Sequence, residues 1–166
     1  MSEQTPAELG DVAKTVTVPV PVAEAFRIFV EEPLDWVPPG HKHLKDATYI
    51  AIEPGVGGRF FERNDAGTEA VHGVITEWEP PSRLVMTWRV GENWQPILDD
   101  EKASFIILSF TEAAPGSTKV VLTHSQFHRH GAIAATLRAA VDGPSPGETL
   151  ARYAEAVARH ATAATA

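Results

Sequence analysis

The sequence contains no cysteine. Without thiols the chain cannot form disulfides, thiolate zinc sites or iron–sulfur clusters, and it has no cysteine nucleophile. It also has no run near the ~18 uninterrupted apolar residues that a membrane-spanning helix needs. The first 13 residues hold Glu3, Glu8 and Asp11 and no apolar segment, so we expect no secretory signal. These absences favour a soluble, cytoplasmic protein.

Basic residues are also scarce. The chain has 14 Lys+Arg against 22 Asp+Glu, a formal net charge of -8. Phosphate groups are repelled by such a surface unless positive charge gathers on one face, and the sequence shows no basic stripe. Nor is there a basic amphipathic helix that would hold the chain on anionic lipid. The sequence therefore predicts neither a nucleic acid nor a membrane as partner.

The chain contains enough apolar residues to form one globular core. The 166 residues are 43% hydrophobic, and a chain of this length typically forms a single domain. Its pattern divides into a flexible leader over residues 1–12, a domain over residues 13–160 and a frayed tail over residues 161–166.

The first part of the domain combines a strand with helices. Apolar and polar residues alternate over residues 14–20, which predicts a half-buried strand. Pro21 opens a helix with apolar residues at helical spacing, and Pro33 ends it. A short second helix or turn follows, as far as Pro39 and Gly40.

The middle of the chain alternates with a period of two, and the end returns to helical periodicity. Turn-forming Gly, Pro, Asn and Asp separate the expected strands. These strands cover residues 47–52, 59–62, 68–79, 83–90, 103–111 and 118–124. Helices are expected over residues 132–141 and 147–160, with a break at Asp142–Pro146. This order predicts an α+β protein with an antiparallel sheet.

Several short motifs occur in a specific order along the chain. They are Pro21–Phe26 after the first strand, Gly57–Phe60, Gly73 within a strand, Pro80–Pro81 before Arg83–Leu84 and Thr87–Trp88, and a last strand with Thr118, Val120, Leu122 and His124. Together they resemble the AHSA-type domain, the family of homologues of the activator of heat-shock protein 90 ATPase. This family belongs to the START/Bet-v-1-like superfamily, also called SRPBCC.

The resemblance spans residues 13–160 and implies a helix-grip fold. In that fold about six or seven antiparallel strands form a curved sheet around a long C-terminal helix, and two short helices follow the first strand. The resemblance also implies a cavity between the sheet and the last helix. Small side chains on that helix, Ala151, Ala154, Ala156 and Ala158, favour empty volume there.

The expected cavity lining combines large side chains of the strands with the apolar stripe of the last helix. For each single residue the alternative of plain core packing stays open. The predicted lining residues are Phe26, Trp36, Phe60, His72, Trp78, Met86, Trp88, Val120, Leu122, His124, Leu150, Tyr153, Ala154 and Val157.

His124 is the one catalytic candidate among them, and a weak one. Period two places it on the face of Val120 and Leu122, where its ring could bind a ligand or act as a general base. Alternatively it caps the strand end by bonding to backbone. Glu62 or Glu69 becomes a catalytic candidate only if burial raises its pKa. No serine lies in a nucleophile-elbow pattern.

Histidines are frequent, but their spacing matches no metal motif. His41 and His43 flank one residue, and His124, His128 and His130 gather after the last strand. The second group has no neighbouring Asp or Glu to orient the rings. We therefore expect no metal site and no cofactor.

Three functions remain open on the sequence. The first is a non-catalytic protein that binds a small hydrophobic or amphipathic ligand in the cavity. The second, implied by the resemblance, is a module that interacts with a chaperone of the heat-shock protein 90 type. The third is a cyclase/dehydratase-like enzyme acting on a bound polyketide-like ligand. A homodimer also stays open.

Overall fold

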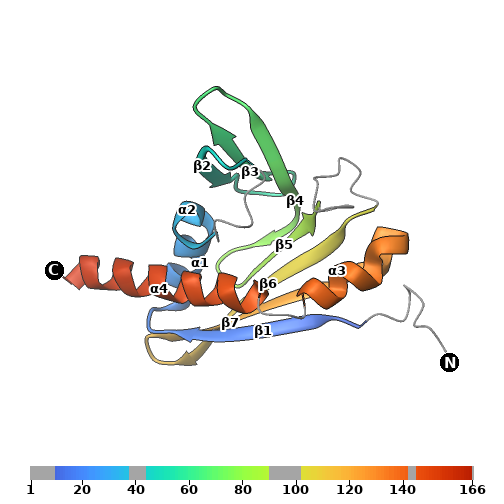
Figure 1. Ribbon diagram of the computed structural model, residues 1–166. Coiled ribbons are helices and arrows are strands. Elements are labelled where there is room, and N and C mark those ends of the chain that lie inside the picture. The colour runs from blue at the N-terminus through green and yellow to red at the C-terminus, as the bar shows by residue number, and fades with distance from the viewer. Residues whose placement is uncertain (1–9, 38–43, 90–101, 142–144, 166) are drawn as a thin grey trace.

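The computed structural model describes residues 10–37, 44–89, 102–141 and 145–165, which form one curled antiparallel sheet with helices packed against it (Figure 1). The seven strands lie in the order β1-β7-β6-β5-β4-β3-β2. The elements are β1 (Val12–Val18), α1 (Val22–Glu31), α2 (Pro33–Trp36), β2 (Ala47–Ile52), β3 (Arg59–Asn64), β4 (Glu69–Glu79), β5 (Arg83–Trp88), β6 (Ser104–Ala114), β7 (Ser117–Ser125), the 3-10 helix η5 (Phe127–Ile133), α3 (Ala134–Val141) and α4 (Ser145–Thr165).

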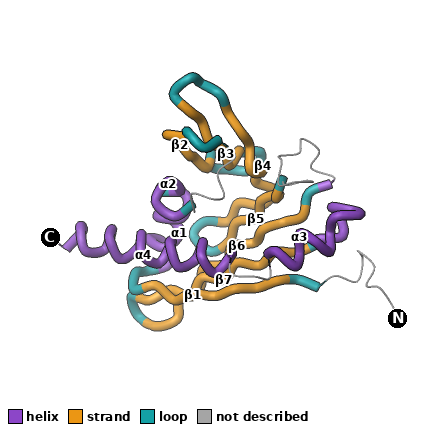
Figure 2. Tube along the Cα trace, in the orientation of Figure 1, coloured by secondary structure: helices purple, strands orange, loops and turns teal. Residues whose placement is uncertain are grey.

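This architecture confirms the predicted α+β helix-grip fold. The helix α4 crosses the sheet and packs against β1 and α2, while α1 packs against β6 and β2 (Figure 2). We call the sheet face that these helices cover the inner face, and the opposite one the outer face. None of the helices in the described ranges is long and apolar enough to cross a membrane.

Alternation along the strands decides which side chains enter the core. On the inner face Leu84 lies opposite Leu108, and Leu108 lies opposite Leu122, across three neighbouring strands. Leu84 and Leu108 are fully buried, as the period of two predicts. Burying apolar surface at about 25 cal/mol per Å² makes such rows the main source of stability in a sheet packed by helices.

Two helices are held together by a tyrosine. Tyr153 of α4 is fully buried, and its hydroxyl donates a hydrogen bond to the backbone carbonyl of Ala25 in α1 at 2.6 Å. Its ring packs edge-on against Phe29 with a centroid distance of 5.5 Å. Desolvation raises the pKa of the Tyr153 hydroxyl, so it stays a donor. This predicted lining residue therefore fixes α4 on α1.

One glycine is required by the close approach of β4 and β5. A Cβ atom built on Gly73 would lie 1.8 Å from the backbone oxygen of Thr87, far inside contact distance. The Thr87 hydroxyl also accepts a hydrogen bond from the Val74 N–H at 2.9 Å. Gly73, noted in the sequence as a mid-strand glycine, thus allows the backbones of β4 and β5 to approach closely.

The structure also corrects some boundaries. β1 starts at Val12, two residues before the expected strand, and Pro21 is the residue before α1 in an extended conformation. α4 begins at Ser145 instead of Gly147 and continues to Thr165, through most of the expected tail. The leader as far as residue 9, His41 and His43, and residues 142–144 of the expected break lie outside the described residues.

The sequence missed the 3-10 helix η5. It follows β7 directly, and Gly131 interrupts it with a positive φ of 68°. A 3-10 helix has three residues per turn and only a few turns, so its side chains do not repeat with the 3.6 period used to find α-helices.

Candidate functional site

The inner face carries a buried acid next to a histidine at the β3–β4 end of the sheet. Glu62 of β3 has no exposed surface, and its Oε2 lies 3.1 Å from Nε2 of His72 in β4. The Leu44 backbone N–H donates to the other oxygen, Oε1. The side chain of His72 is 13% exposed. We call these two residues the Glu62–His72 pair.

A β-bulge explains why His72 reaches Glu62. Phe60 pairs with Gly73 and Phe61 with Val71, so His72 is the extra residue between two ladder positions. An extra residue of this kind turns its side chain away from strict alternation. His72 therefore lies beside Glu62 and Phe60, although simple alternation does not predict this neighbour.

The hydrogen bonds of the Glu62–His72 pair assign its protons. When Glu62 is ionised its carboxylate only accepts hydrogen bonds, and the His72 Nε2 then carries the proton that the two groups share. The lone pair of a neutral His72 ring is then on Nδ1. This is the arrangement by which a buried acid fixes the tautomer of a histidine base.

Aromatic rings continue from His72 towards the helices. The Phe60 ring lies 4.8 Å from the His72 ring, and Trp36 meets Phe60 edge-on at 5.8 Å. Trp36 also stacks on Phe29 at 4.3 Å and donates from Nε1 to the backbone carbonyl of Phe29 at 2.9 Å. The Glu62–His72 pair is therefore flanked by a fixed aromatic wall.

A second polar group lies at the other end of the inner face. The Ser104 Oγ of β6 lies 2.7 Å from His124 Nε2 of β7 and 2.7 Å from His130 Nε2 of η5. Ser104 is fully buried and His124 is 2% exposed. Desolvation, and then the charge of His130, lowers the pKa of His124 to about 3, so its ring is neutral at physiological pH.

His124 thus bonds a hydroxyl, and the alternative of a strand-end cap bonded to backbone is wrong. Its ring stacks on Phe127 at 4.4 Å and meets the edge of Trp88 at 4.5 Å. His128, the other member of the predicted histidine group, is exposed. His124 and His130 instead converge on one serine, which the sequence reasoning did not select.

The other predicted lining residues divide between two parts of the core. Trp88 packs in a small cluster with Val12 and Phe127, near His124. The larger cluster contains or contacts Phe26, Trp36, Phe60, Trp78, Met86, Val120, Leu122, Leu150, Tyr153, Ala154 and Val157. The cavity among them stays a prediction.

The small side chains of α4 do not all face the sheet. Ala151 and Ala158 are exposed, whereas Ala156 is fully buried and Ala154 is partly buried. At 100° per residue, the stripe of Leu150, Tyr153 and Val157 leaves positions 151 and 158 on the far side of the helix. Only part of the expected small surface therefore lies towards the core.

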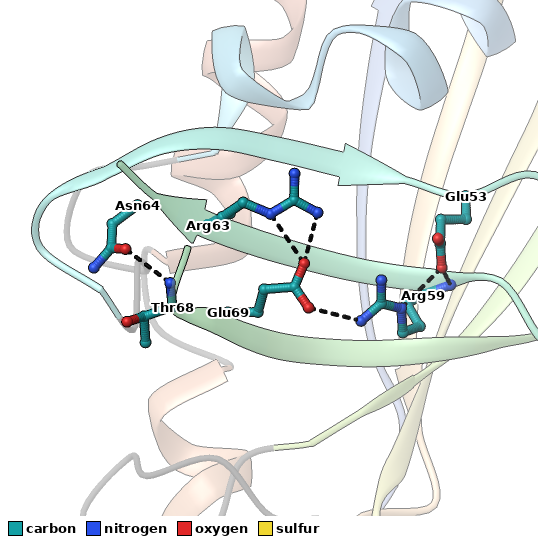
Figure 3. Close-up of polar contacts among 6 residues, drawn as sticks. All are labelled: Glu53, Arg59, Arg63, Asn64, Thr68 and Glu69. Atoms are coloured by element: carbon teal, nitrogen blue, oxygen red, sulfur yellow. Dashed lines mark hydrogen bonds and ion pairs between the residues drawn. The ribbon is translucent and has the colours of Figure 1, made fainter. Parts of the chain in front are cut away.

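Glu69, the second acid considered in the sequence, lies on the outer face (Figure 3). It is bridged by Arg63 at 2.6 Å and by Arg59 at 3.2 Å. Hydrogen bonds from Arg63 and then Arg59 lower the pKa of the Glu69 carboxyl. Glu69 is therefore excluded by the stated condition of a pKa raised by burial, whereas Glu62 is fully buried.

Glu32, Asp35 and His160 come together where α2 meets α4. Their potential ligand atoms lie within 4.8 Å of one another, and His160 Nε2 is 3.0 Å from Asp35 Oδ2. All three are partly exposed. No pattern in the sequence marks this group, because α4 must first dock on α2 to bring its members together. It joins two helices as an ion pair when His160 is protonated.

Residues 20–142 match the protein family described as "Activator of Hsp90 ATPase homolog 1-like protein". This chain belongs to that family, as the motifs predicted. No match was found among curated proteins.

Among solved structures, the chain is similar to the anthrahydroquino-gamma-pyrone synthase Txn09. The two share 45% sequence identity over 89% of this chain and 97% of that one, with a TM-score of 0.63.

Two further structures share the fold at lower identity. They are the self-sacrificing resistance protein CalC from Micromonospora echinospora and protein NE0264 from Nitrosomonas europaea. CalC is 24% identical, over 91% of this chain and 96% of its own, with a TM-score of 0.62. NE0264 is 17% identical, over 91% and 96%, with a TM-score of 0.61.

Proposed function

We propose that the chain is a cyclase/dehydratase-like enzyme that closes an oxygen-containing ring on an aromatic polyketide-like substrate. One observation carries this proposal: 45% identity to a pyrone synthase over 89% of the chain and 97% of the synthase. The sequence had placed this function third, behind a non-catalytic binding protein. Similarity at this level now favours the enzyme.

The Glu62–His72 pair supplies the acid–base group that such a reaction needs. A carboxylate without exposed surface costs free energy unless hydrogen bonds compensate it, and here His72 and the Leu44 N–H provide them. A buried acid that orients a histidine is typical of catalytic sites. The neighbouring rings of Phe60 and Trp36 suit a flat aromatic substrate.

The chemistry can be written with these groups. In an aromatic hydroxyl compound with a neighbouring 1,3-diketone, His72 Nδ1 takes the hydroxyl proton while the oxygen bonds to the far carbonyl carbon. That carbonyl oxygen takes up a proton and becomes the hydroxyl of a cyclic hemiketal. Loss of this hydroxyl as water, with the proton of the carbon between the carbonyls, gives the γ-pyrone ring. Glu62 holds the His72 ring and stabilises its charged form.

The experiment uses purified full-length protein and an anthrahydroquinone that carries a 1,3-diketone side chain. A hydroxyl group on the aromatic ring lies ortho to this side chain. Ring closure is followed by liquid chromatography and mass spectrometry. The product is lighter than the substrate by one water, about 18 Da. We expect turnover above the uncatalysed rate. His72→Gln and Glu62→Gln should each lower kcat by about 10²–10⁴-fold, the usual contribution of acid–base catalysis.

Glu69→Gln is the matched control, because Glu69 lies on the outer face of the same two strands. It should leave kcat within about twofold, since surface ion pairs contribute little. Near-normal activity of His72→Gln, with thermal unfolding showing a folded variant, rejects the acid–base role. Binding of the compound without any turnover would instead support the non-catalytic binding protein. The chaperone interaction remains a prediction that an ATPase assay with purified chaperone tests.

A further inference from the structure

We propose that Glu32, Asp35 and His160 bind one divalent transition-metal ion, with Zn²⁺ as the best fit, where α2 meets α4. The three side chains come from three places, since Glu32 follows α1, Asp35 belongs to α2 and His160 belongs to α4. The spacing of histidines along the chain predicted no metal site, and only the docking of α4 on α2 brings this set together. The site goes beyond the proposed function, because it shares no residue with the Glu62–His72 pair.

The distances among the potential ligand atoms fit a single ion. His160 Nε2 and Asp35 Oδ2 are 3.0 Å apart, and all three ligand atoms lie within 4.8 Å of one another. Zn²⁺ binds imidazole nitrogen and carboxylate oxygen at about 2.0–2.2 Å, so two of its ligands are about 2.8–3.6 Å apart. His160 and Asp35 already have this spacing. Rotation about the side-chain bonds of Glu32 can bring its oxygen the remaining distance.

The types of donor atom favour a transition-metal ion over Mg²⁺ or Ca²⁺. Those two ions prefer sites made of oxygen ligands alone. One imidazole nitrogen beside two carboxylates suits Zn²⁺, which uses the same ligand types in sites that keep a fourth position for water. Because all three residues are partly exposed, water can reach that position.

The charge around the site favours a cation. Glu32 and Asp35 are two carboxylates at short range, which repel each other. Arg27, the basic residue of α1, is hydrogen-bonded to Glu24 and reaches Glu32 only as a through-space charge. Within the described ranges, no lysine or arginine forms an ion pair with Glu32 or Asp35. A neutral His160 leaves both negative charges uncompensated, and a divalent ion compensates them.

The turn between α1 and α2 fixes the two acids. The Asp35 N–H donates to the Glu32 backbone carbonyl at 3.0 Å, so the two residues lie on one turn of chain. Trp36, the next residue, is buried and donates from its indole to the Phe29 carbonyl. The backbone that carries both carboxylates is therefore anchored in the core.

The histidine is fixed from the other helix. Tyr153 holds α4 on α1 through its hydrogen bond to the Ala25 carbonyl. His160 follows seven residues later, which is nearly two helical turns, so it lies on the same side of α4 as Tyr153. Because the ligands stand on elements that are already packed together, little ordering is needed when an ion binds.

The test uses full-length protein that has been stripped of metal with a chelator, which is then removed by dialysis. Isothermal titration calorimetry with ZnCl₂ at about pH 7.5, where metal-binding histidines are neutral, measures the stoichiometry and the affinity. We expect one Zn²⁺ per chain and no competition from millimolar Mg²⁺ or Ca²⁺. Zn²⁺ should also raise the temperature of thermal unfolding, because an ion that binds the folded state stabilises it.

Two variants and a control assign the ion to this site. His160→Gln and Asp35→Asn each remove one ligand and should weaken Zn²⁺ binding by at least about 10–100-fold. His128→Gln is the matched control, because His128 is an exposed histidine of η5. It should leave the affinity unchanged. Circular dichroism shows whether each variant is folded.

Co²⁺ gives a second measurement, because this paramagnetic ion broadens the nuclear magnetic resonance signals of residues close to it. The signals of α2 and of residues 157–160 should be lost first. Those of α3, at the opposite side of the molecule from the C-terminal end of α4, should remain (Figure 1).

A protein that binds no Zn²⁺ in a one-to-one complex overturns the site. So does binding that His160→Gln leaves unchanged, since other histidines then hold the ion, and so does Mg²⁺ binding of equal affinity. If Asp35→Asn does not fold, His160→Gln and the Co²⁺ measurement decide. Turnover measured with a chelator present tests the Glu62–His72 proposal separately, so the failure of one proposal leaves the other untouched.

Discussion

Glu62 and Glu69 lie on opposite faces of the same pair of strands, β3 and β4, and each accepts hydrogen bonds from basic side chains. Glu62 has no exposed surface and bonds to His72 and to one backbone N–H. Glu69 is exposed and bonds to Arg59 and Arg63 (Figure 3). The residue type is the same, and the environment differs.

The difference shows that burial separates a catalytic candidate from a surface ion pair. On the outer face water screens the charges, and such pairs contribute about 0–1 kcal/mol. On the inner face the carboxylate depends on a small fixed set of donors, and losing one of them leaves a buried group unsatisfied. Replacing one partner of an acid–base pair therefore costs little stability on the outer face and much more on the inner face.

The neighbouring phenylalanines repeat this comparison. Phe60 points inward between His72 and Trp36, and Phe61 points outward beneath Arg59, whose guanidinium lies 4.2 Å from the ring centroid. Phe61 is only 3% exposed, and its ring lies beside the ring of Tyr49 and beneath the guanidinium groups of Arg59 and Arg63. Flexible arginine side chains therefore bury it.

The largest expected effect in this comparison is that of Phe60→Ala. It should lower the free energy of unfolding by about 3–5 kcal/mol, because fixed rings around Phe60 cannot close the resulting cavity. Phe61→Ala should cost less, about 1.5–3 kcal/mol, since the arginines above it can move inward and only the transfer of the ring is lost. Urea denaturation measures both values, and equal costs would contradict the comparison.

The second expected effect is a loss of folding stability at acidic pH. The pKa of His124 is lowered to about 3 in the folded protein from an ordinary 6.5, so the unfolded chain binds a proton first as the pH falls. Stability is complete above about pH 6.5 and declines between about pH 6.5 and 3, by about 1.4 kcal/mol per pH unit. His124→Gln should remove this part of the dependence of the free energy of unfolding on pH. Urea denaturation at a series of pH values measures it.

The carboxylates of the outer face affect the free energy of unfolding at lower pH than His124 does. The pKa values of Glu53 and Glu69 lie below their ordinary 4.5, because Arg59 bonds to Glu53, and Arg63 and Arg59 bond to Glu69. Their contribution to the free energy of unfolding is therefore present above about pH 4.5 and is lost as the pH falls below that value. A His124→Gln slope that equals the wild-type slope between about pH 6.5 and 5 would show that the buried ring does not control acid stability.

The smallest expected effect is that of Ala154→Leu, which tests whether the inner face leaves space next to α4. Ala154 is partly buried against the main core cluster. If the predicted cavity reaches this residue, the added side chain fills it, and thermal unfolding shows stability unchanged or raised. Binding of a hydrophobic fluorescent probe should be lost at the same time. A loss of about 1–3 kcal/mol with probe binding intact indicates a filled core at this point.

Much of the fold followed from local patterns. The alternation in residues 47–52 and 118–124, the turn at Asn64–Gly67 and the helix after Pro21 all correspond to elements of the structure. Period two also placed His124 on the inward side of its strand. The resemblance of the motifs gave the family, which the match of residues 20–142 then confirmed.

The candidate sites were predicted only in part. His72 and His124 were selected as lining residues, and Glu62 as a conditional acid, but none was given its partner. Glu62 and His72 meet because a bulge shifts the register between β3 and β4. Ser104 was missed because nothing near it in the sequence marks a serine that two distant histidines approach.

The sequence by itself thus determined the strands and helices, their order and the inward or outward side of most strand residues, since these depend on side-chain periodicity and local backbone preference. The tertiary structure alone decided the hydrogen-bond partners of Glu62 and His124. Ser104 and His124 are 20 positions apart, and Ser104 and His130 are 26 apart. Such contacts depend on strand register, a bulge and the packing of η5 after β7, where a shift of one residue moves every side chain to the other face.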